Sequence, residues 1–476
     1  MSIIQNILSE SISYGKRLGA TFVELRSQSV ERTTIELLDG KGDAIHGSDQ
    51  GTAIRVIVDG TWGFVSVASF DPQILKKGVR DAYSIAKLGA KNKRESVELY
   101  PVQPFSDRIK KKWDVDPREI PSVEKKDRFV DMHKRIINSD EKNRILGSTV
   151  AYADITGIQY YQNSDDIEVT MDKCITWAKI NANGKDGIIR AGAREEMGSS
   201  SGYTPFNQEN LEEVAEILAQ RIITNIEAKN AKGGVFPAVL APSVAGVFAH
   251  EACGHLFEAD ITETGIIGTT LGKKIASEHA TIIDDGTIPD AIGSFPYDDE
   301  GTSVEKTTIL DQGRVSALLT NREYAHKFTE ITKNTDSDIA VAPSGNARAF
   351  DFRVEPLIRM RNTYFAPGDF TMEELLEGIN FGYYFIAFLG GEASGEGTFT
   401  VGVNEAFEIV KGELGQSIRG VSISGNTMET LLGISGAGKK ETFHVTAGRC
   451  GKFQTAFTGD GGPLVRVNAI NVVGEG

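Results

Sequence analysis

The pattern of apolar and polar residues predicts helices and antiparallel strands in the first half of the chain. Apolar residues recur every three to four positions in residues 2–18, in residues 72–90 and from about Ser122 onward, as they do on the buried face of a helix. Period-two alternation predicts strands over 21–29, 32–38, 53–58 and 63–67, a hairpin turn at Asp59-Gly60, and a meander over 144–201. This mixture predicts an α+β unit.

The second half of the chain has the pattern of a β-rich domain. Turn pairs such as Asp285-Gly286 and Lys411-Gly412 punctuate it, and one clear helix is expected to start at Thr371, where Glu374 completes a capping box. The apolar run 235–242 predicts a buried strand, preceded by a break at Lys232-Gly233-Gly234. We therefore place the domain boundary here, with an N-terminal domain of mixed helices and antiparallel sheet at 1–232 and a β-rich domain at 233–476.

The hexapeptide His250-Glu251-Ala252-Cys253-Gly254-His255 is the main candidate for chemistry. It follows Ser243, which is expected to cap a helix, and residues that are apolar on nearly every side, which is typical of a buried helix. A lone buried carboxylate is costly, and a divalent metal with a water would satisfy both imidazoles and the carboxylate. Two histidines with a Glu after the first form a zinc-peptidase arrangement, with Glu251 as the base. The competing interpretation is two core histidines beside an unrelated Glu.

The spacing of the two histidines predicts a distorted helix. His250 and His255 are five residues apart, which places them about 140° apart around a regular helix of 3.6 residues per turn. Both can face one metal only if the helix widens into a π-bulge or breaks at Gly254. We expect one of these between Cys253 and His255.

A zinc site needs a third protein ligand, which the residues alone leave open. Zinc takes Cys, His, Asp or Glu, and a catalytic site keeps its fourth position for water. The candidates are Cys253, Glu258, His279, His444 and Cys450.

Two glycine-rich stretches have weaker functional interpretations. Residues 433–440 nearly match a phosphate-binding loop, but Lys440 stands where a Ser or Thr would ligate Mg²⁺, and a strand is expected to follow instead of a helix. Gly390 and Gly391 indicate either a β turn or a close approach of another backbone.

Composition narrows the class of protein further. The formal net charge of −15 argues against a general nucleic-acid or anionic-membrane surface. Three cysteines cannot form a disulfide framework and favour a reducing compartment. The start of the chain lacks the pattern of a signal peptide, and no apolar run is long enough to span a bilayer, so we expect a cytoplasmic protein.

Several segments together resemble the TldD/PmbA family, on its metallopeptidase (TldD) side. The hexapeptide is followed by Phe257-Glu258-Ala259-Asp260, and later segments fall in the family's order along nearly the whole chain. They include Asp298-Asp299-Glu300-Gly301-Thr302, Arg359-Met360-Arg361-Asn362-Thr363-Tyr364, Gly390-Gly391, and Cys450-Gly451-Lys452. The chain departs from the common Gly-Leu-Glu-Gly-Asp pattern, because Phe257 and Ala259 are bulkier, which leaves the shape of the pocket open.

The resemblance implies a zinc-dependent peptidase with Zn²⁺ held by His250, His255 and Cys450 and with Glu251 as general base. It implies an α+β N-terminal domain for dimerisation and substrate enclosure, and a β-rich C-terminal domain that carries the metal-binding helix. The expected substrate is an extended peptide or an unfolded protein segment. The expected assembly is a homodimer, or a heterodimer with a PmbA/TldE-like subunit.

We therefore expect hydrolysis of peptide bonds in which zinc polarises the carbonyl and Glu251 activates the water. One alternative is a metal-dependent amidohydrolase that acts on small molecules and not on proteins. The other is a peptide-binding assembly subunit with a vestigial metal site.

Overall fold

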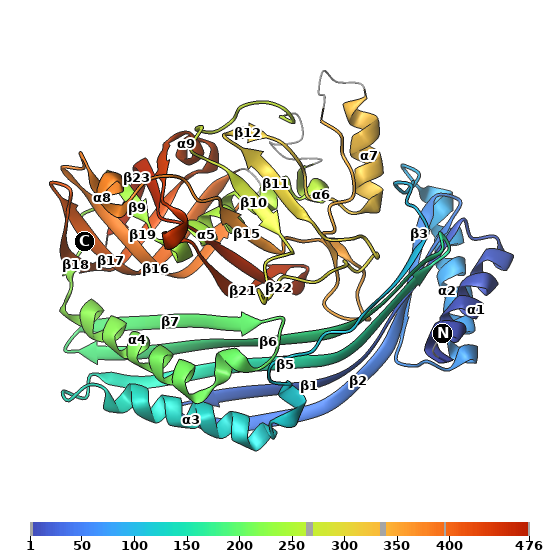
Figure 1. The fold of residues 1–476 in the computed structure, drawn as a ribbon, viewed down its shortest axis with the longest axis horizontal. Coiled ribbons are helices and arrows are strands. Elements are labelled where there is room, and N and C mark those ends of the chain that lie inside the picture. Colours follow the sequence, from blue (N-terminus) through green and yellow to red (C-terminus); the bar gives the residue numbers. More distant parts are fainter. Residues whose placement is uncertain (1–2, 263–269, 334–338, 395–396, 475–476) are drawn as a thin grey trace.

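The N-terminal part of the chain forms one strongly curved sheet. The computed structural model describes residues 3–262, 270–333, 339–394 and 397–474. The long strands of this sheet run beneath the C-terminal body and bend upward at one end (Figure 1). The body therefore lies on the concave side of the sheet.

The order of strands in this sheet is β3-β2-β1-β5-β6, and β6 also pairs with β4 and β7. All pairs are antiparallel except β4 with β6. The strands are β1 (Phe22–Leu38), β2 (Lys41–Val58), β3 (Thr61–Val67), β4 (Phe105–Ile109), β5 (Ile145–Asn163), β6 (Ile167–Asp186) and β7 (Ile189–Ser199).

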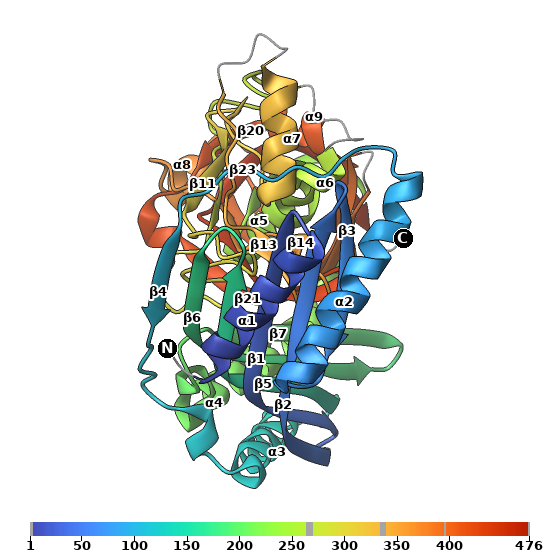
Figure 2. The same cartoon turned by 90° about the vertical axis from the view of Figure 1, so that its right-hand side faces the viewer.

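Four helices cover the face of this sheet that is turned away from the C-terminal body. Helices α1 (Ile3–Leu18) and α2 (Pro72–Gly89) pack on its upturned end, and α3 (Ser122–Asn138) and α4 (Gln208–Glu227) pack on its other end (Figures 1 and 2). Each helix pair has its own hydrophobic cluster with the strands. The three helices expected in residues 2–18, 72–90 and from Ser122 are confirmed, and Ser2 lies outside the described residues.

The expected break between residues 29 and 32 is wrong, because β1 is one continuous strand. It is paired along its length with β2 on one side and β5 on the other, and Glu31 faces Ser48 and Thr156. Two partner strands satisfy the backbone here, so the charged Glu31 does not interrupt the ladder. The hairpin at Asp59-Gly60 is confirmed, with φ values of 49° and 69° that suit a tight two-residue turn.

The C-terminal body contains two sheets. In the larger one the path β16-β9-β23-β19-β17 is joined at its ends by the additional pairing of β16 with β17, and β18, β8 and β20 attach to it. Its strands are β16 (Phe381–Ala393), β9 (Gly234–Leu240), β23 (Val465–Gly474), β19 (Val421–Asn426), β17 (Thr398–Val410), β18 (Glu413–Arg419), β8 (Lys229–Asn230) and β20 (Ile434–Ala437).

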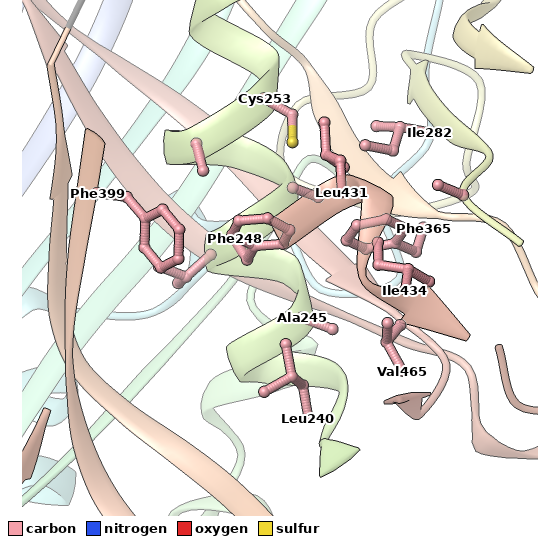
Figure 3. Packing of buried hydrophobic residues seen from close by; sticks show 14 of the residues in the cluster. Leu240, Ala245, Phe248, Cys253, Ile282, Phe365, Phe399, Leu431, Ile434 and Val465 are labelled. Atoms are coloured by element: carbon pink, nitrogen blue, oxygen red, sulfur yellow. The ribbon is translucent and has the colours of Figure 1, made fainter. Parts of the chain in front are cut away.

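The smaller sheet supplies the hairpin that completes the candidate site. Its order is β12-β11-β10-β15-β22-β21. The strands are β12 (Arg314–Val315), β11 (Lys306–Asp311), β10 (Ile282–Asp285), β15 (Asn362–Phe365), β22 (Gln454–Gly462) and β21 (His444–Lys452). A hydrophobic cluster joins both sheets to the helix that follows β9, and Phe248 lies at its centre between Phe365 and Phe399 (Figure 3).

The second half is β-rich, as expected, but it holds more helix than its pattern suggests. Helix α7 (Arg322–Thr332) was not expected. The helix at Thr371 is confirmed with its capping box, although α8 (Met372–Leu376) is only five residues long. The glycine-rich stretch 433–440 contains β20 and runs into a short 3₁₀ turn at Lys440–Thr442, after which β21 starts at His444. Without a helix after it, this stretch lacks the structure of a phosphate-binding loop.

The two halves are docked through buried polar contacts. Arg55 of β2 pairs with Glu24 of β1 at 2.5 Å and with Glu300 of the C-terminal body at 2.7 Å. Asp299 accepts a hydrogen bond from Gln159 of β5 at 2.7 Å. The acidic segment 298–302 therefore binds the N-terminal sheet. Within the described part of the chain, no helix is long and apolar enough to cross a membrane.

Candidate metal centre

The helix that carries the hexapeptide changes its winding twice. It starts as α5 (Pro242–Val247), continues as a π-helix (Phe248–Cys253) and ends as a 3₁₀ turn (Gly254–Phe257). The expected cap at Ser243 is wrong, because the helix already begins at Pro242 and the Ser243 hydroxyl donates to the Ile386 carbonyl oxygen at 2.8 Å. Proline is favoured at this first helical position, since its missing N–H is not needed there.

The expected distortion of the helix is confirmed, and it begins one turn earlier than predicted. A π-helix places residues i and i+5 above one another, as an α-helix does for i and i+4. The rings of His250 and His255 consequently lie 5.2 Å apart between centroids and nearly perpendicular. Close packing also constrains the break after Cys253, because a Cβ atom at Gly254 would overlap the buried Met360 sulfur.

The fold brings Cys450 of β21 to the two histidines. One ligand atom from each of His250, His255 and Cys450 lies within 4.8 Å of the others. The Cys450 Sγ is 3.2 Å from His255 Nε2. The Nδ1 atom of His250, a residue only 3 % exposed, has no hydrogen-bond partner among the described residues. Two imidazole nitrogens and a thiol within 4.8 Å of one another form a donor set that a metal ion can bridge.

Charge complements this geometry. Burial raises the pKa of the Cys450 thiol, but His250 and His255 lower it more, and the result is a pKa of about 4. Burial lowers the pKa of His255, whereas the contacts with Cys450 and Glu258 raise it to about 10. The metal-free site therefore holds a thiolate beside imidazolium, and the thiolate is the form that binds metals.

The other four candidates for a third ligand do not place a donor atom between the two histidines. Cys253 is fully buried in the hydrophobic cluster, where burial raises the pKa of its thiol (Figure 3). Glu258 lies behind His255 and accepts from its Nδ1 atom at 3.1 Å. His279 packs edge-on against Phe370. His444 is an exposed residue at the start of β21. Cys450 is thus the candidate that joins both histidines.

Glu251 lies at the open side of this group. Its Oε2 atom is 3.8 Å from His255 Nε2, and its side chain is 27 % exposed. Gly391 of β16 lies beside it, since a Cβ atom there would be 2.8 Å from Val247 Cγ1 and 3.6 Å from Glu251 Cγ. Gly390 and Gly391 lie inside β16, so the expected turn is wrong, and the helix atoms that approach Gly391 belong to side chains and not to a backbone. Glu251 is therefore a partly exposed carboxylate beside the two histidines.

Sequence reasoning missed three carboxylates around the site. Asp260 pairs with Lys452 at 2.7 Å. Asp460 of β22 accepts from Thr446 Oγ1 at 2.7 Å, and burial raises its pKa to about 6. Glu196 comes from β7 of the N-terminal sheet, where it accepts from Trp177 Nε1 at 3.1 Å and pairs with Arg194. The family segment Phe257-Glu258-Ala259-Asp260 was the only signal in the sequence for any of them.

Two imidazoles and a thiolate form a donor set that zinc takes in proteins, with one coordination position left for water or substrate. The fold is α+β, with a β-rich body that carries the helix of this site. These features define a candidate mononuclear metal protein with a partly exposed carboxylate, Glu251, beside the metal position.

Comparison with known proteins identifies the family. A model described as the PmbA/TldA metallopeptidase C-terminal domain matches residues 233–474, and the family's central domain and domain 1 match residues 115–226 and 23–86. A protein named "Metalloprotease" from Methanothermobacter thermautotrophicus is 32% identical over 95% of both chains. A "Zinc metalloprotease TldD homolog" from Saccharolobus solfataricus is 30% identical over 97% of this chain and 99% of that one. The chain belongs to the PmbA/TldD family of metallopeptidases.

Solved structures share the fold. TldE from Thermococcus kodakarensis matches with a TM-score of 0.75 at 20% identity, covering 98% of this chain and all of that one. A protein from Thermotoga maritima, described as a putative modulator of a DNA gyrase, matches with a TM-score of 0.76 at 20% identity, with the same coverage.

Proposed function

We propose that this protein is a zinc-dependent peptidase in which His250, His255 and Cys450 hold the metal and Glu251 is the general base. The observation that carries the proposal is the convergence of three donor atoms within 4.8 Å from one distorted helix and a strand late in the chain. The name of the zinc metalloprotease from Saccharolobus solfataricus supports the choice of metal.

The residues around this position have complementary roles. Zinc, when bound, polarises the scissile carbonyl and lowers the pKa of a coordinated water to roughly 7. The Glu251 carboxylate takes a proton from the attacking water and transfers it to the leaving amine. The two histidines and Cys450 hold the metal, and the apolar packing around Phe248 keeps the helix rigid behind them.

The proposed substrate is an extended peptide or an unfolded protein segment. Strand β7 of the N-terminal sheet lies next to the site, because its Arg194 donates a hydrogen bond to the Leu389 carbonyl oxygen of β16. The same strand places Glu196 near Gly448, two residues before Cys450. A site between two sheets favours a narrow, extended chain over a folded protein. On this proposal residues 1–232 enclose the substrate and residues 233–476 carry the hydrolytic site.

We further propose that the protein acts in the cytoplasm as a dimer, either with a second copy or with a PmbA/TldE-like subunit. The described cysteines are all unpaired, which fits a reducing compartment. The structural similarity to TldE supports a partner of the same fold. Size measurement of the protein, alone and after co-expression with such a subunit, distinguishes the two assemblies.

The direct test compares the wild type with Glu251→Gln. We expect the variant to keep its zinc, since both imidazoles and the thiolate remain, and to lose hydrolysis of an unfolded protein by roughly 10²- to 10⁴-fold. Full activity in Glu251→Gln would show that the base is a different group. Parallel assays on a dipeptide and a small amide test the amidohydrolase alternative, which requires activity on the small molecules only. Peptide binding without turnover by the zinc-loaded wild type would instead favour the assembly-subunit alternative.

A further inference from the structure

Glu258 lies behind His255 and is the most completely enclosed carboxylate near the site. Its side chain is 0 % exposed, and one of its oxygens, Oε2, is 3.1 Å from His255 Nδ1. The other oxygen, Oε1, accepts from the Met360 backbone N–H at 3.3 Å. The Met360 backbone therefore helps to hold the carboxylate against the ring of His255.

This hydrogen bond determines which nitrogen of His255 can bind a metal. A neutral imidazole carries its proton on one nitrogen and offers a lone pair on the other. In the neutral ring that binds a metal, the proton stays on Nδ1, where it is hydrogen-bonded to Glu258, and Nε2 has the lone pair. Nε2 is the atom that lies 3.2 Å from the Cys450 sulfur, and therefore the atom on the metal side.

Lys452 connects Glu258 to the strand that carries Cys450. Its Nζ donates to Glu258 Oε2 at 2.9 Å, to Asp260 at 2.7 Å and to the Ile358 carbonyl oxygen at 3.1 Å. Lys452 is two residues after Cys450 on β21, so both side chains are on the same face of the strand. One buried ion pair thus joins the helix of the histidines to the hairpin of the thiolate.

We propose that Glu258 is a positioning residue for the metal site: it sets the Nδ1–H form of His255 and, through Lys452, holds that ring at its distance from Cys450. The proposal rests on the proposed zinc site and assigns Glu258 no contact with the metal or the substrate. Carboxylates behind a metal-binding histidine typically contribute 10- to 100-fold to metal affinity.

The experiment measures zinc affinity by competition with a chelator in wild type, Glu258→Gln and Asp260→Asn. Asp260 is the matched control, because it also accepts a hydrogen bond from Lys452, whereas the carboxylate hydrogen-bonded to His255 Nδ1 is that of Glu258. Glu258→Gln leaves Asp260 to pair with Lys452. We expect zinc affinity to fall 10- to 100-fold in Glu258→Gln and less than about threefold in Asp260→Asn.

Thermal unfolding of the metal-free proteins separates positioning from folding. A purely structural role for Glu258 predicts a lower melting temperature of the metal-free variant with unchanged zinc affinity of the folded fraction, and that result would overturn the proposal. Equal loss of affinity in Asp260→Asn would also overturn it, since the ion-pair network as a whole would then be responsible. If Glu258→Gln does not fold, Glu258→Gln with Lys452→Gln removes both charges, and the same 10- to 100-fold loss is expected.

The two proposals fail in different ways. A wild-type protein that binds no zinc contradicts the proposed function. A wild type that binds zinc, with a folded Glu258 variant that binds it equally well, leaves the proposed function standing and contradicts the positioning role alone.

Discussion

Two cysteines near the hexapeptide provide the sharpest test of the metal site. Cys450 and Cys253 are both buried thiols, but Cys450 Sγ lies 3.2 Å from His255 Nε2, whereas Cys253 is fully enclosed in the hydrophobic cluster. Cys450→Ala removes one of three donors, and Cys253→Ala removes one sulfur atom from the core. The same substitution therefore has two different expected results.

The magnitudes follow from the number of ligands. Four-ligand structural zinc sites bind with about 10–16 kcal/mol, which is roughly 2.5–4 kcal/mol per ligand. Loss of the Cys450 thiolate should therefore weaken zinc binding roughly 100- to 1,000-fold. Cys253→Ala should leave zinc affinity within about threefold, and its free energy of unfolding should fall by about 1 kcal/mol from lost core contacts.

The assay is metal content after dialysis against a weak chelator, followed by titration of each metal-free protein with zinc. Circular dichroism and thermal unfolding confirm that both variants are folded before their affinities are compared. If Cys253→Ala loses zinc while Cys450→Ala keeps it, the site described above is wrong and the helix supplies its own third donor.

Two further predictions concern the helix break and the charges of the site. Gly254→Ala should lower the free energy of unfolding by about 1–3 kcal/mol, because the new Cβ overlaps the Met360 sulfur. Gly451→Ala is the control and should be nearly neutral, since no atom lies within 4 Å of its new Cβ. Equal denaturant midpoints for the two variants would contradict this packing. In the metal-free protein, the folded state lowers the pKa of Cys450 from 9.0 to about 4, so the contribution of Cys450 to the free energy of unfolding is lost as the pH falls through this range. The folded state raises the pKa of His255 from 6.5 to about 10, so the contribution of His255 is lost as the pH rises through that range. Between pH values of about 6.5 and 9 the two contributions change with pH in opposite directions and cancel. The melting temperature should therefore have a plateau in this range and fall on either side of it. A pH profile that is unchanged by Cys450→Ala would refute this account.

Local patterns in the sequence were sufficient to predict the elements that local interactions control. The amphipathic helices, the Asp59-Gly60 turn and the Thr371–Glu374 capping box depend on residues at most a few positions apart. The distorted winding after Phe248 could also be predicted, since two histidines five residues apart can share a metal only on a widened turn. The α+β class followed from the same periodicities.

The pattern of apolar residues predicts which face of a helix or strand is buried, but not which other element covers that face. The continuity of β1 through Glu31 depends on two partner strands, one of them more than a hundred residues away along the chain. Helix α7 was missed for a related reason, because it lies in a region whose turn signals predicted strands. The domain boundary near residue 233 is still a prediction.

For the candidate site, too, the sequence predicted one part and the tertiary structure decided the rest. The sequence by itself determined His250, Glu251 and His255 as a unit, because they lie within six consecutive residues of one buried segment. It offered five third ligands, and resemblance to a family favoured Cys450. Only the tertiary structure placed Cys450 beside His255, turned Cys253 into the core and set Glu258 behind the imidazole. These distances depend on how β21 packs against the helix, and contacts between residues 195 positions apart leave no periodic trace in either segment.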